Sequence, residues 1–325
     1  MGQLQDAFGR KLQYLRLSVT EKCNFSCMYC LPTGCSKQSS SPPLSALEID
    51  RLVRALAELG IWKVRLTGGE PTIRTDIVEI VRRVALSPGI RRIGLTTNGY
   101  RLHAIASQLR EAGLTSLNVS LDSLDPERFA RITGFSRMES IVAGVEAAVA
   151  AGIPSVKVNA VLMKGLDDAE LDRFLAWTRE LPLTVRFIEL MQTGDRAFFE
   201  RYHVPGAELQ AKLHERGWTM LERQQGDGPA TNYGHPAHAG RIGIIAPYSK
   251  GFCESCNRLR VSAAGSLKLC LFGEAEVPLR DRLQSDGQRH ELMTLLESAV
   301  KTKPEAHLLH EGRTGRITSL ASIGG

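Results

Sequence analysis

The sequence predicts an α/β protein with a parallel sheet, because short strand-like runs alternate with segments of helical periodicity over its first 190 residues. Six runs are expected to be strands, and they are Leu12–Val19, Trp62–Thr67, Arg91–Thr96, Ser116–Leu121, Ser155–Leu162 and Leu183–Leu190. Repeated βα units of this kind fit either a partial barrel or a doubly wound sheet. Periodicity alone does not distinguish the two.

The helices between these strands are predicted from apolar residues that recur three and four positions apart. The three clearest sets are Ile49, Leu52, Val53, Leu56 and Leu59, then Ile77, Ile80, Val81 and Val84, then Leu102, Ile105, Ala106 and Leu109. Ser45 and Glu48 have the spacing of a capping box at the start of the first helix. Pro42-Pro43 marks the end of the preceding loop.

Length and composition indicate a soluble, cytoplasmic protein with a substantial core. The chain has 325 residues, of which 43% are hydrophobic, and it suits one large domain with a smaller appendage. It contains no apolar run of about 18 residues, and its polar start is neither a secretory signal nor a transit peptide. The net charge of +6 favours an anionic partner. The sequence contains no continuous basic block, which makes nucleic acid and a membrane surface less favoured as that partner.

The strand pattern fades after Leu190, and the glycine- and proline-rich segment Arg223–Gly240 is expected to be a loop or linker. We therefore expect two domains. The core domain is predicted to span residues 4–226, and a C-terminal region is predicted to span residues 227–325.

Three cysteines, Cys23, Cys27 and Cys30, follow the first predicted strand at spacings that suit metal ligation. Three thiolates are one ligand short of the four cysteines that usually hold an iron–sulfur cluster, so one iron is left open. A structural zinc site would require a closed tetrahedral set. Six of the seven cysteines fall into two triads, which indicates metal ligands in a reducing compartment. Cys35 is left over.

A second triad consists of Cys253, Cys256 and Cys270. The segment Asn257–Phe272 has the alternation of a hairpin that turns near Ala264-Gly265. Such a hairpin places Arg258 and Arg260 on one face and Cys270 roughly opposite Arg258. A zinc ribbon is the alternative, with His235 or His238 completing a tetrahedral set.

Polar and basic residues interrupt strands that would otherwise be apolar on both faces. They share single strand faces: Arg16 with Ser18, Lys63 with Arg65 and Thr67, and Lys157 with Asn159, while Arg186 lies within the sixth strand. At an effective dielectric near 20, one cation about 4 Å from a phosphate charge contributes roughly 4 kcal/mol before desolvation. The pattern predicts a cationic lumen whose occupant carries phosphates.

The first triad, with Tyr29 before its last cysteine and Gly68-Gly69-Glu70-Pro71 after the second strand, resembles the radical S-adenosylmethionine superfamily. Arg16, the Asn257-Arg258-Leu259-Arg260 segment, the second triad and the terminal Gly324-Gly325 narrow the resemblance to its GTP cyclase family, which begins molybdenum cofactor (molybdopterin) biosynthesis. The similarity extends from about Leu12 to Gly325.

The resemblance implies a partial (β/α)6 barrel whose mouth is closed by a C-terminal iron–sulfur cluster region. It also implies two [4Fe-4S] clusters, ligated by Cys23, Cys27, Cys30, Cys253, Cys256 and Cys270. S-adenosyl-L-methionine is expected to contact Tyr29, Gly69, Ser120 and Met191, and GTP is expected to contact Arg16, Arg65, Thr96, Lys157, Arg258, Leu259 and Arg260. Arg16, Arg258, Arg260, Gly324 and Gly325 are the expected catalytic residues.

The implied reaction converts GTP to (8S)-3′,8-cyclo-7,8-dihydroguanosine 5′-triphosphate. The implied partners are an electron donor such as flavodoxin or ferredoxin and a downstream cyclic pyranopterin monophosphate synthase, with the enzyme a monomer or homodimer. Three alternatives remain open from the residues: a peptide-modifying radical enzyme, a basic zinc-ribbon protein that binds nucleic acid, and a tRNA-modifying radical enzyme.

Overall fold

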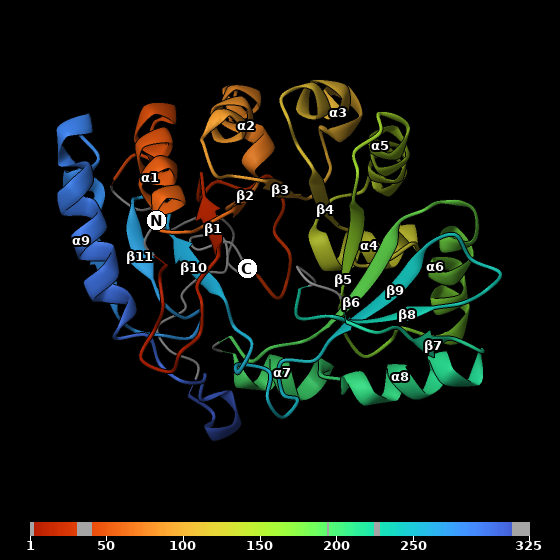
Figure 1. The fold of residues 1–325 in the computed structure, drawn as a ribbon. Coiled ribbons are helices and arrows are strands. Elements are labelled where there is room, and N and C mark those ends of the chain that lie inside the picture. Colours follow the sequence, from red (N-terminus) through yellow and green to blue (C-terminus); the bar gives the residue numbers. More distant parts are fainter. Residues whose placement is uncertain (1–2, 31–40, 194, 224–227, 314–325) are drawn as a thin grey trace. The chain divides into compact units, whose positions relative to one another are not determined.

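The computed structural model describes residues 3–30, 41–193, 195–223 and 228–313 (Figure 1). The chain divides into two compact units. Unit 1 consists of residues 1–97, 107–116 and 253–325, and unit 2 consists of residues 98–106 and 117–252. Unit 1 is therefore built from both ends of the chain.

Unit 1 contains a six-stranded sheet in the order β12-β11-β10-β1-β2-β3. Its strands are β1 (Tyr14–Ser18), β2 (Lys63–Thr67), β3 (Arg92–Thr97), β10 (Arg258–Val261), β11 (Ser266–Lys268) and β12 (Glu276–Pro278). Its helices are α1 (Ala46–Glu58), α2 (Ile77–Leu86) and α9 (Arg289–Val300), with the short 3-10 helices η1 (Pro71–Ile73), η2 (Arg280–Arg282), η3 (Asp286–Gln288) and η4 (Leu309–Glu311). Strands β10, β1, β2 and β3 are parallel, whereas β11 and β12 are antiparallel additions.

The core of unit 1 forms where alternate apolar residues of the strands meet the apolar faces of the helices. Leu15 and Leu17 of β1 are fully buried, as are Leu52 and Leu56 of α1. Figure 1 shows α1, α2 and α9 side by side along the sheet. The capping box predicted at Ser45 is present, because its side chain accepts from the Glu48 backbone N–H while the Glu48 carboxylate accepts from the Ser45 N–H.

Unit 2 contains the other six strands, in the order β4-β5-β6-β9-β8-β7. Its strands are β4 (Ser116–Ser120), β5 (Val156–Leu162), β6 (Thr184–Glu189), β7 (Thr219–Met220), β8 (Thr231–Gly234) and β9 (Arg241–Ile245). Its helices are α4 (Pro126–Thr133), α5 (Met138–Ala150), α6 (Asp168–Glu180), α7 (Arg196–Tyr202) and α8 (Gly206–Glu215), while α3 (Leu102–Glu111) has residues in both units. Strands β4, β5, β6 and β9 are parallel, and β7 and β8 are antiparallel.

All six strands predicted from the sequence are present, with ends that differ by two residues or fewer. The expectation of a loop over Arg223–Gly240 is wrong in part, because Thr231–Gly234 forms β8 and pairs with β9. The predicted domain boundary at residue 226 lies within residues 224–227, outside the described residues. Among the described residues, none of the helices combines the length and the apolar character that crossing a membrane would require.

Candidate functional site

The first cysteine triad follows β1 and is braced by the segment after β2. The N–H of Cys30 donates to the carbonyl oxygen of Cys27, which closes a tight turn (2.9 Å). The N–H of Gly69 donates to the backbone oxygen of Thr20, and the N–H of Glu70 donates to that of Lys22; each donor–acceptor distance is 2.8 Å. The chain just before Cys23 is therefore fixed to the end of β2.

Glycine is required twice at this junction. A β carbon on Gly69 would lie 2.1 Å from the backbone oxygen of Lys22, and one on Gly68 would lie 2.2 Å from that of Thr20. Gly68 also has a φ of +144°, which side chains rarely allow. The glycine pair that the sequence assigned to cofactor binding thus also allows two backbone segments to touch.

Glu70 is fully buried at the same junction and organises the residues around it. Its Oε1 accepts hydrogen bonds from the Thr72 backbone N–H (2.9 Å), the Thr72 hydroxyl (2.5 Å) and the Thr97 hydroxyl (2.6 Å). Because a buried carboxylate needs such donors, this network links the ends of β2 and β3 beside the first triad.

The second triad is built by a turn and a hairpin. The N–H of Cys256 donates to the oxygen of Cys253 (3.0 Å), as in the first triad. The predicted hairpin is confirmed, since β10 and β11 are antiparallel with Arg260 opposite Lys268. β11 ends at Lys268, and extending that register by two residues on each strand gives Cys270 the position opposite Arg258 that the sequence predicts.

The two triads lie at opposite ends of the neighbouring strands β1 and β10. Strand β1 leads into Cys23 at its C-terminal end, whereas its parallel neighbour β10 begins just after Cys256. The N–H groups of Gln13 and Tyr14 both donate to the oxygen of Asn257, which fixes the second triad beside the start of β1 (3.1 Å each). At about 3.3 Å per residue, the two ends of β1 are roughly 15–20 Å apart.

Arginines form a row across the sheet between the two triads. Arg16 of β1 is paired in register with Arg260 of β10 on one side and with Arg65 of β2 on the other. Arg65 and Arg260 are buried, and Arg16 is partly buried. Burial, with the charges of Arg65 and Arg258 adding to it, lowers the pKa of Arg16 to about 10. Burial and the neighbouring Arg16 and Arg258 lower the pKa of Arg260 well below its ordinary value.

Arg65 is held in place by three hydrogen-bond acceptors. Its guanidinium donates to the hydroxyl of Tyr14 (2.8 Å), the backbone oxygen of Leu95 (3.1 Å) and the hydroxyl of Ser116 (3.2 Å). Its guanidinium also packs over Gly94, where a β carbon would lie 2.7 Å from Cζ. Arg65 therefore supplies a fixed positive charge.

Tyr14 responds to this charge and is a residue that the sequence analysis missed. Burial would raise the pKa of its phenol, but the charges of Arg65, Arg16 and Lys63 outweigh burial and lower the pKa to about 7. Lys63 Nζ lies 4.6 Å from the centre of the Tyr14 ring. The signal was in the sequence, because Tyr14 lies two positions from Arg16 and so shares its strand face.

A buried hydroxyl without a partner lies on the next strand of unit 1. The Oγ1 of Thr96 is shielded from solvent and has no hydrogen-bond partner within the part of the chain that the structure describes. Thr96 is two positions from Gly94, so it shares the face that Arg65 covers. An unpaired buried hydroxyl costs free energy, which makes Thr96 ready to bond a ligand.

Unit 2 carries its own polar face. Ser120 of β4, Asn159 of β5 and Arg186 of β6 are cross-strand neighbours in register, and Asn118 is paired with Lys157 in the same way. The side-chain oxygens of Asn118 and Asn159 are buried, and neither has a hydrogen-bond partner among the described residues. Met191 follows β6 and is partly exposed. Unit 2 thus brings together the predicted residues Ser120 and Lys157. Asn118 is two positions before Ser120 on the same strand, so the alternation of strand faces could have predicted it as a further site residue.

The remaining predicted residues are placed as follows. Tyr29 is partly exposed in the turn of the first triad. Leu259 is fully buried and alternates with Arg258 and Arg260, so its side chain lies on the opposite face of β10. Gly324 and Gly325 lie outside the described residues, and so does Cys35.

The six triad cysteines are partly exposed, and none is joined to another of the six in a disulfide. Cysteine thiolates are the usual ligands of iron–sulfur clusters, so both triads have the donor type that such a cluster needs.

The two histidines that the zinc-ribbon alternative would use as ligands contact other residues. His235 and His238 both pack on the buried Trp218, with ring centres 5.5 and 4.7 Å from its own. His238 Nδ1 pairs with the hydroxyl of Thr178 (3.0 Å), and His235 Nδ1 accepts from the N–H of Ala237 (3.1 Å). Both rings have a structural role inside unit 2.

The thiolate form of the second triad is favoured by its surroundings. Burial by itself would raise the pKa of Cys256, but the charges of Arg258 and Lys303, with hydrogen bonds from the backbone and side chain of Arg258, lower it to about 7. A thiolate is the form that ligates iron. The second triad is therefore suited to hold a metal cluster.

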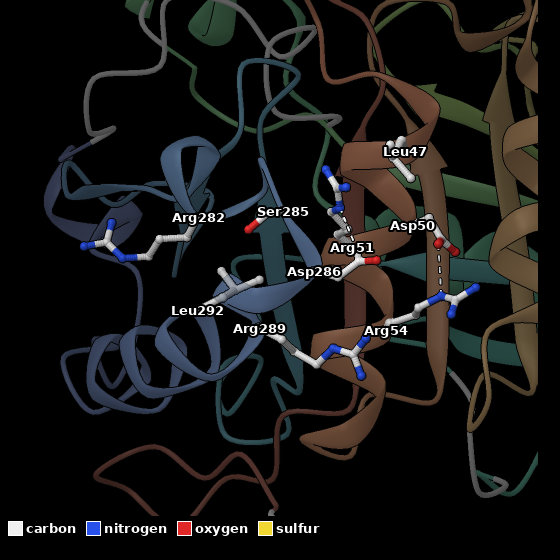
Figure 2. Close-up of a pocket in the computed structure, with 9 residues that line it drawn as sticks. All are labelled: Leu47, Asp50, Arg51, Arg54, Arg282, Ser285, Asp286, Arg289 and Leu292. Carbon is white, nitrogen blue, oxygen red and sulfur yellow. Dashed lines mark hydrogen bonds and ion pairs between the residues drawn. The ribbon is translucent and has the colours of Figure 1, made fainter.

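A surface cavity of about 160 Å³ lies elsewhere in unit 1, between α1 and the segment from η2 to α9 (Figure 2). It is lined by Leu47, Asp50, Arg51, Arg54, Arg282, Ser285, Asp286, Arg289 and Leu292. Figure 2 shows Arg51 reaching Asp286 (2.8 Å) and Arg54 reaching Asp50 (3.0 Å). None of the predicted site residues lines it, and the Arg51–Asp286 ion pair joins the C-terminal segment to α1.

Two protein-family models match the chain. The Radical SAM superfamily matches residues 17–178, and Molybdenum Cofactor Synthesis C matches residues 183–309. Curated relatives are similar over their full length, and all three described here are called GTP 3′,8-cyclase. The one from Aeromonas hydrophila is 51% identical, with 100% of this chain and 97% of the relative covered. The one from Shewanella denitrificans is 50% identical (100% and 97%), and the one from Vibrio cholerae is 51% identical (99% and 98%).

Solved structures of distant sequence share the fold. Streptococcus suis SuiB bound to S-adenosylmethionine has a TM-score of 0.64 at 13% identity, covering 90% of this chain and 69% of its own. Native anSMEcpe with bound AdoMet has a TM-score of 0.57 at 14% identity, covering 87% and 83%. These likenesses concern the fold alone, and they confirm the predicted α/β class.

Proposed function

The chain belongs to the GTP 3′,8-cyclase family, and from that premise we propose that each cysteine triad holds one [4Fe-4S] cluster with one iron open to a small molecule. As a radical S-adenosylmethionine enzyme it converts GTP to (8S)-3′,8-cyclo-7,8-dihydroguanosine 5′-triphosphate, the first step of molybdenum cofactor biosynthesis.

Cys23, Cys27 and Cys30 are the ligands of the first cluster in this proposal. When bound there, the cluster and S-adenosylmethionine supply the 5′-deoxyadenosyl radical that removes hydrogen from the ribose 3′ carbon of GTP. The protein contributes the rigid junction at Gly69, which sets the position of the first triad through Thr20 and Lys22. Tyr29, Gly69, Ser120 and Met191 are the proposed contacts of S-adenosylmethionine.

Cys253, Cys256 and Cys270 are the proposed ligands of the second cluster, whose open iron receives the guanine. Arg16, Arg65, Arg258 and Arg260 hold the triphosphate or nearby polar atoms. Thr96 and Lys157 contact the substrate, and Leu259 contributes through its main chain, since its side chain lies in the core. Closing the reacting atoms into one pocket supplies proximity and protects radicals from solvent.

The observation that carries this proposal is the arginine row Arg260–Arg16–Arg65. Its strand β1 leads to the first triad, and its strand β10 begins just after Cys256 of the second. Mutual repulsion and burial both disfavour these charges, as the lowered pKa values of Arg16 and Arg260 record. A polyanion such as a triphosphate removes that cost.

The C-terminal Gly324-Gly325 completes the active site in this proposal, which follows from the family resemblance. Deleting both residues should abolish cyclisation while leaving the iron content of both clusters intact. Full turnover by this deletion variant would exclude a role for the two terminal glycines in the reaction.

The reaction also needs an electron, and the proposed donor is a flavodoxin or ferredoxin. The product passes to a cyclic pyranopterin monophosphate synthase. These partners agree with a cytoplasmic enzyme that works as a monomer or homodimer and that binds neither nucleic acid nor a membrane.

The direct test is anaerobic incubation of the reconstituted full chain with GTP, S-adenosylmethionine and a reductant. We expect 5′-deoxyadenosine together with a cyclised nucleotide, in equal amounts. Zinc without acid-labile sulfide in an anaerobic preparation would overturn the cluster assignment. Cleavage of S-adenosylmethionine that does not depend on GTP, together with salt-sensitive RNA binding, would instead indicate a tRNA-modifying enzyme.

A further inference from the structure

Lys303 is a buried lysine that lies behind the second cysteine triad. It follows α9 and is 4% exposed. Its Nζ donates to the backbone oxygen of Arg258 (3.3 Å) and to that of Leu269 through a short contact. Arg258 is two residues after Cys256, and Leu269 immediately precedes Cys270. One ammonium group therefore joins the two segments that carry the cysteines.

The charge of Lys303 has no carboxylate partner among the described residues, in contrast to that of the partly exposed Lys212, which pairs with Asp168. Its backbone acceptors are neutral. Burial lowers the pKa of Lys303, whereas the negative charges of Cys256 and Cys270 raise it. A buried ammonium is costly without an anion nearby, and the triad thiolates are the anions that the structure supplies.

We propose that Lys303 is a positioning residue for the second cluster: it clamps the two cysteine-bearing segments, and its positive charge raises the reduction potential of the cluster. The inference rests on the proposed function, because it assumes a cluster at Cys253, Cys256 and Cys270. A fixed positive charge near a cluster stabilises its more negative, reduced form. Lys303 therefore makes reduction easier.

Arg10 provides a matched control, because it touches the same region without an uncompensated charge. Its guanidinium donates to the backbone oxygens of Cys253 (3.1 Å) and Pro304 (2.7 Å). Its Nε pairs with the carboxylate of Asp6 (2.6 Å). Both substitutions remove one positive charge, but Arg10 is partly exposed, so solvent screens its charge more than that of the buried Lys303.

The test is a redox titration of the second cluster, followed by its electron paramagnetic resonance signal. It uses the full chain with Cys23, Cys27 and Cys30 replaced by Ala, so that one cluster is read alone. Lys303→Met, Lys303→Arg and Arg10→Gln are compared in this background. Iron and acid-labile sulfide per chain are measured on every sample.

We expect Lys303→Met to lower the ratio of reduced to oxidised cluster about tenfold at a fixed solution potential, which is about 59 mV for one electron. Lys303→Arg should restore the parent ratio within about twofold, and Arg10→Gln should shift the ratio clearly less than Lys303→Met does. If Lys303→Met loses the cluster, a Lys303→Arg variant that keeps both the cluster and the parent ratio of reduced to oxidised cluster still supports the proposed role of the positive charge. Loss of the cluster in both variants would overturn that role.

An unshifted ratio in a fully loaded Lys303→Met sample would overturn the inference, and so would an equal shift in Arg10→Gln. Neither result would affect the proposed function. A parent background without acid-labile sulfide would instead show that the second triad holds no cluster, and the proposed function would fail at that step.

Discussion

Arg16 of β1 and Arg260 of β10 are in-register neighbours on parallel strands, so two cations lie side by side in a mostly enclosed site. We predict that Arg260→Gln stabilises the enzyme without GTP by about 1–2 kcal/mol, because a repelled and desolvated charge is removed. The same change should weaken GTP binding by about 1.5–3 kcal/mol, roughly 10- to 150-fold. Urea unfolding and GTP titration measure the two effects.

The control for Arg260 is Arg92→Gln, which changes an exposed arginine at the start of β3. It should leave both quantities nearly unchanged. An Arg260 variant that is less stable without GTP would show that the arginine serves the fold and not the ligand.

Thr96 and Thr97 are adjacent residues with opposite predicted responses to valine. Thr97 donates to buried Glu70, so Thr97→Val should cost about 1–3 kcal/mol of stability. The hydroxyl of Thr96 is buried without a partner, so Thr96→Val should leave stability unchanged or raise it. Thr96→Val should instead weaken GTP binding about tenfold. Equal losses of stability in both variants would contradict the assignment of Thr96 to the ligand.

Gly69→Ala should displace the first triad and spare the second. The new β carbon would lie 2.1 Å from the backbone oxygen of Lys22, so the segment before Cys23 must move. We expect about half of the iron to be lost, with the second cluster's signal retained. Gly287→Ala is the matched control, because its β carbon would meet only Ser285 Oγ at 3.8 Å. Full iron content in Gly69→Ala would refute the bracing role.

Glu48 should make stability depend on acid pH. Burial would raise its pKa, but hydrogen bonds from the Ser45 backbone, Arg280 and Gln284 lower it from 4.5 to about 2. A lowered pKa stabilises the fold above the unfolded value, and that stability is lost as pH falls from about 4.5 to 2. Glu48→Gln should therefore cost about 2 kcal/mol at pH 7 and little near pH 2.

Urea unfolding across this pH range measures the Glu48 effect. Asp286→Asn is the comparison, because its carboxylate is 75% exposed and should contribute much less. A gap between wild type and Glu48→Gln that stays constant with pH would rule out the linkage.

The sequence predicted features that depend on short-range pattern. The six strands, the capping box at Ser45 and Glu48, and the hairpin that brings Cys270 level with Arg258 all follow from periodicity within a few residues. The shared faces of the charged strand residues followed from the same alternation. The cysteine triads were recognisable from spacing alone.

Contacts between distant segments were not predictable. Nothing local indicates that β10 pairs with β1 or that β9 joins β6, because strand neighbours depend on the whole topology. Lys303 lies in Lys301-Thr302-Lys303-Pro304, which has the composition of an exposed turn. Its burial behind Cys270 is decided by how the C-terminal segment packs.

The pairing of Tyr14 with Arg258 has a consequence for biosynthesis, since the two positions are 258 − 14 = 244 residues apart. During translation, β1 leaves the ribosome long before its partner strand exists. At about 5–20 residues per second, the gap is roughly 10–50 s. Throughout that interval one edge of β1 is unpaired and open to misassociation. The second triad, whose last cysteine is Cys270, can therefore receive iron only after synthesis is nearly finished.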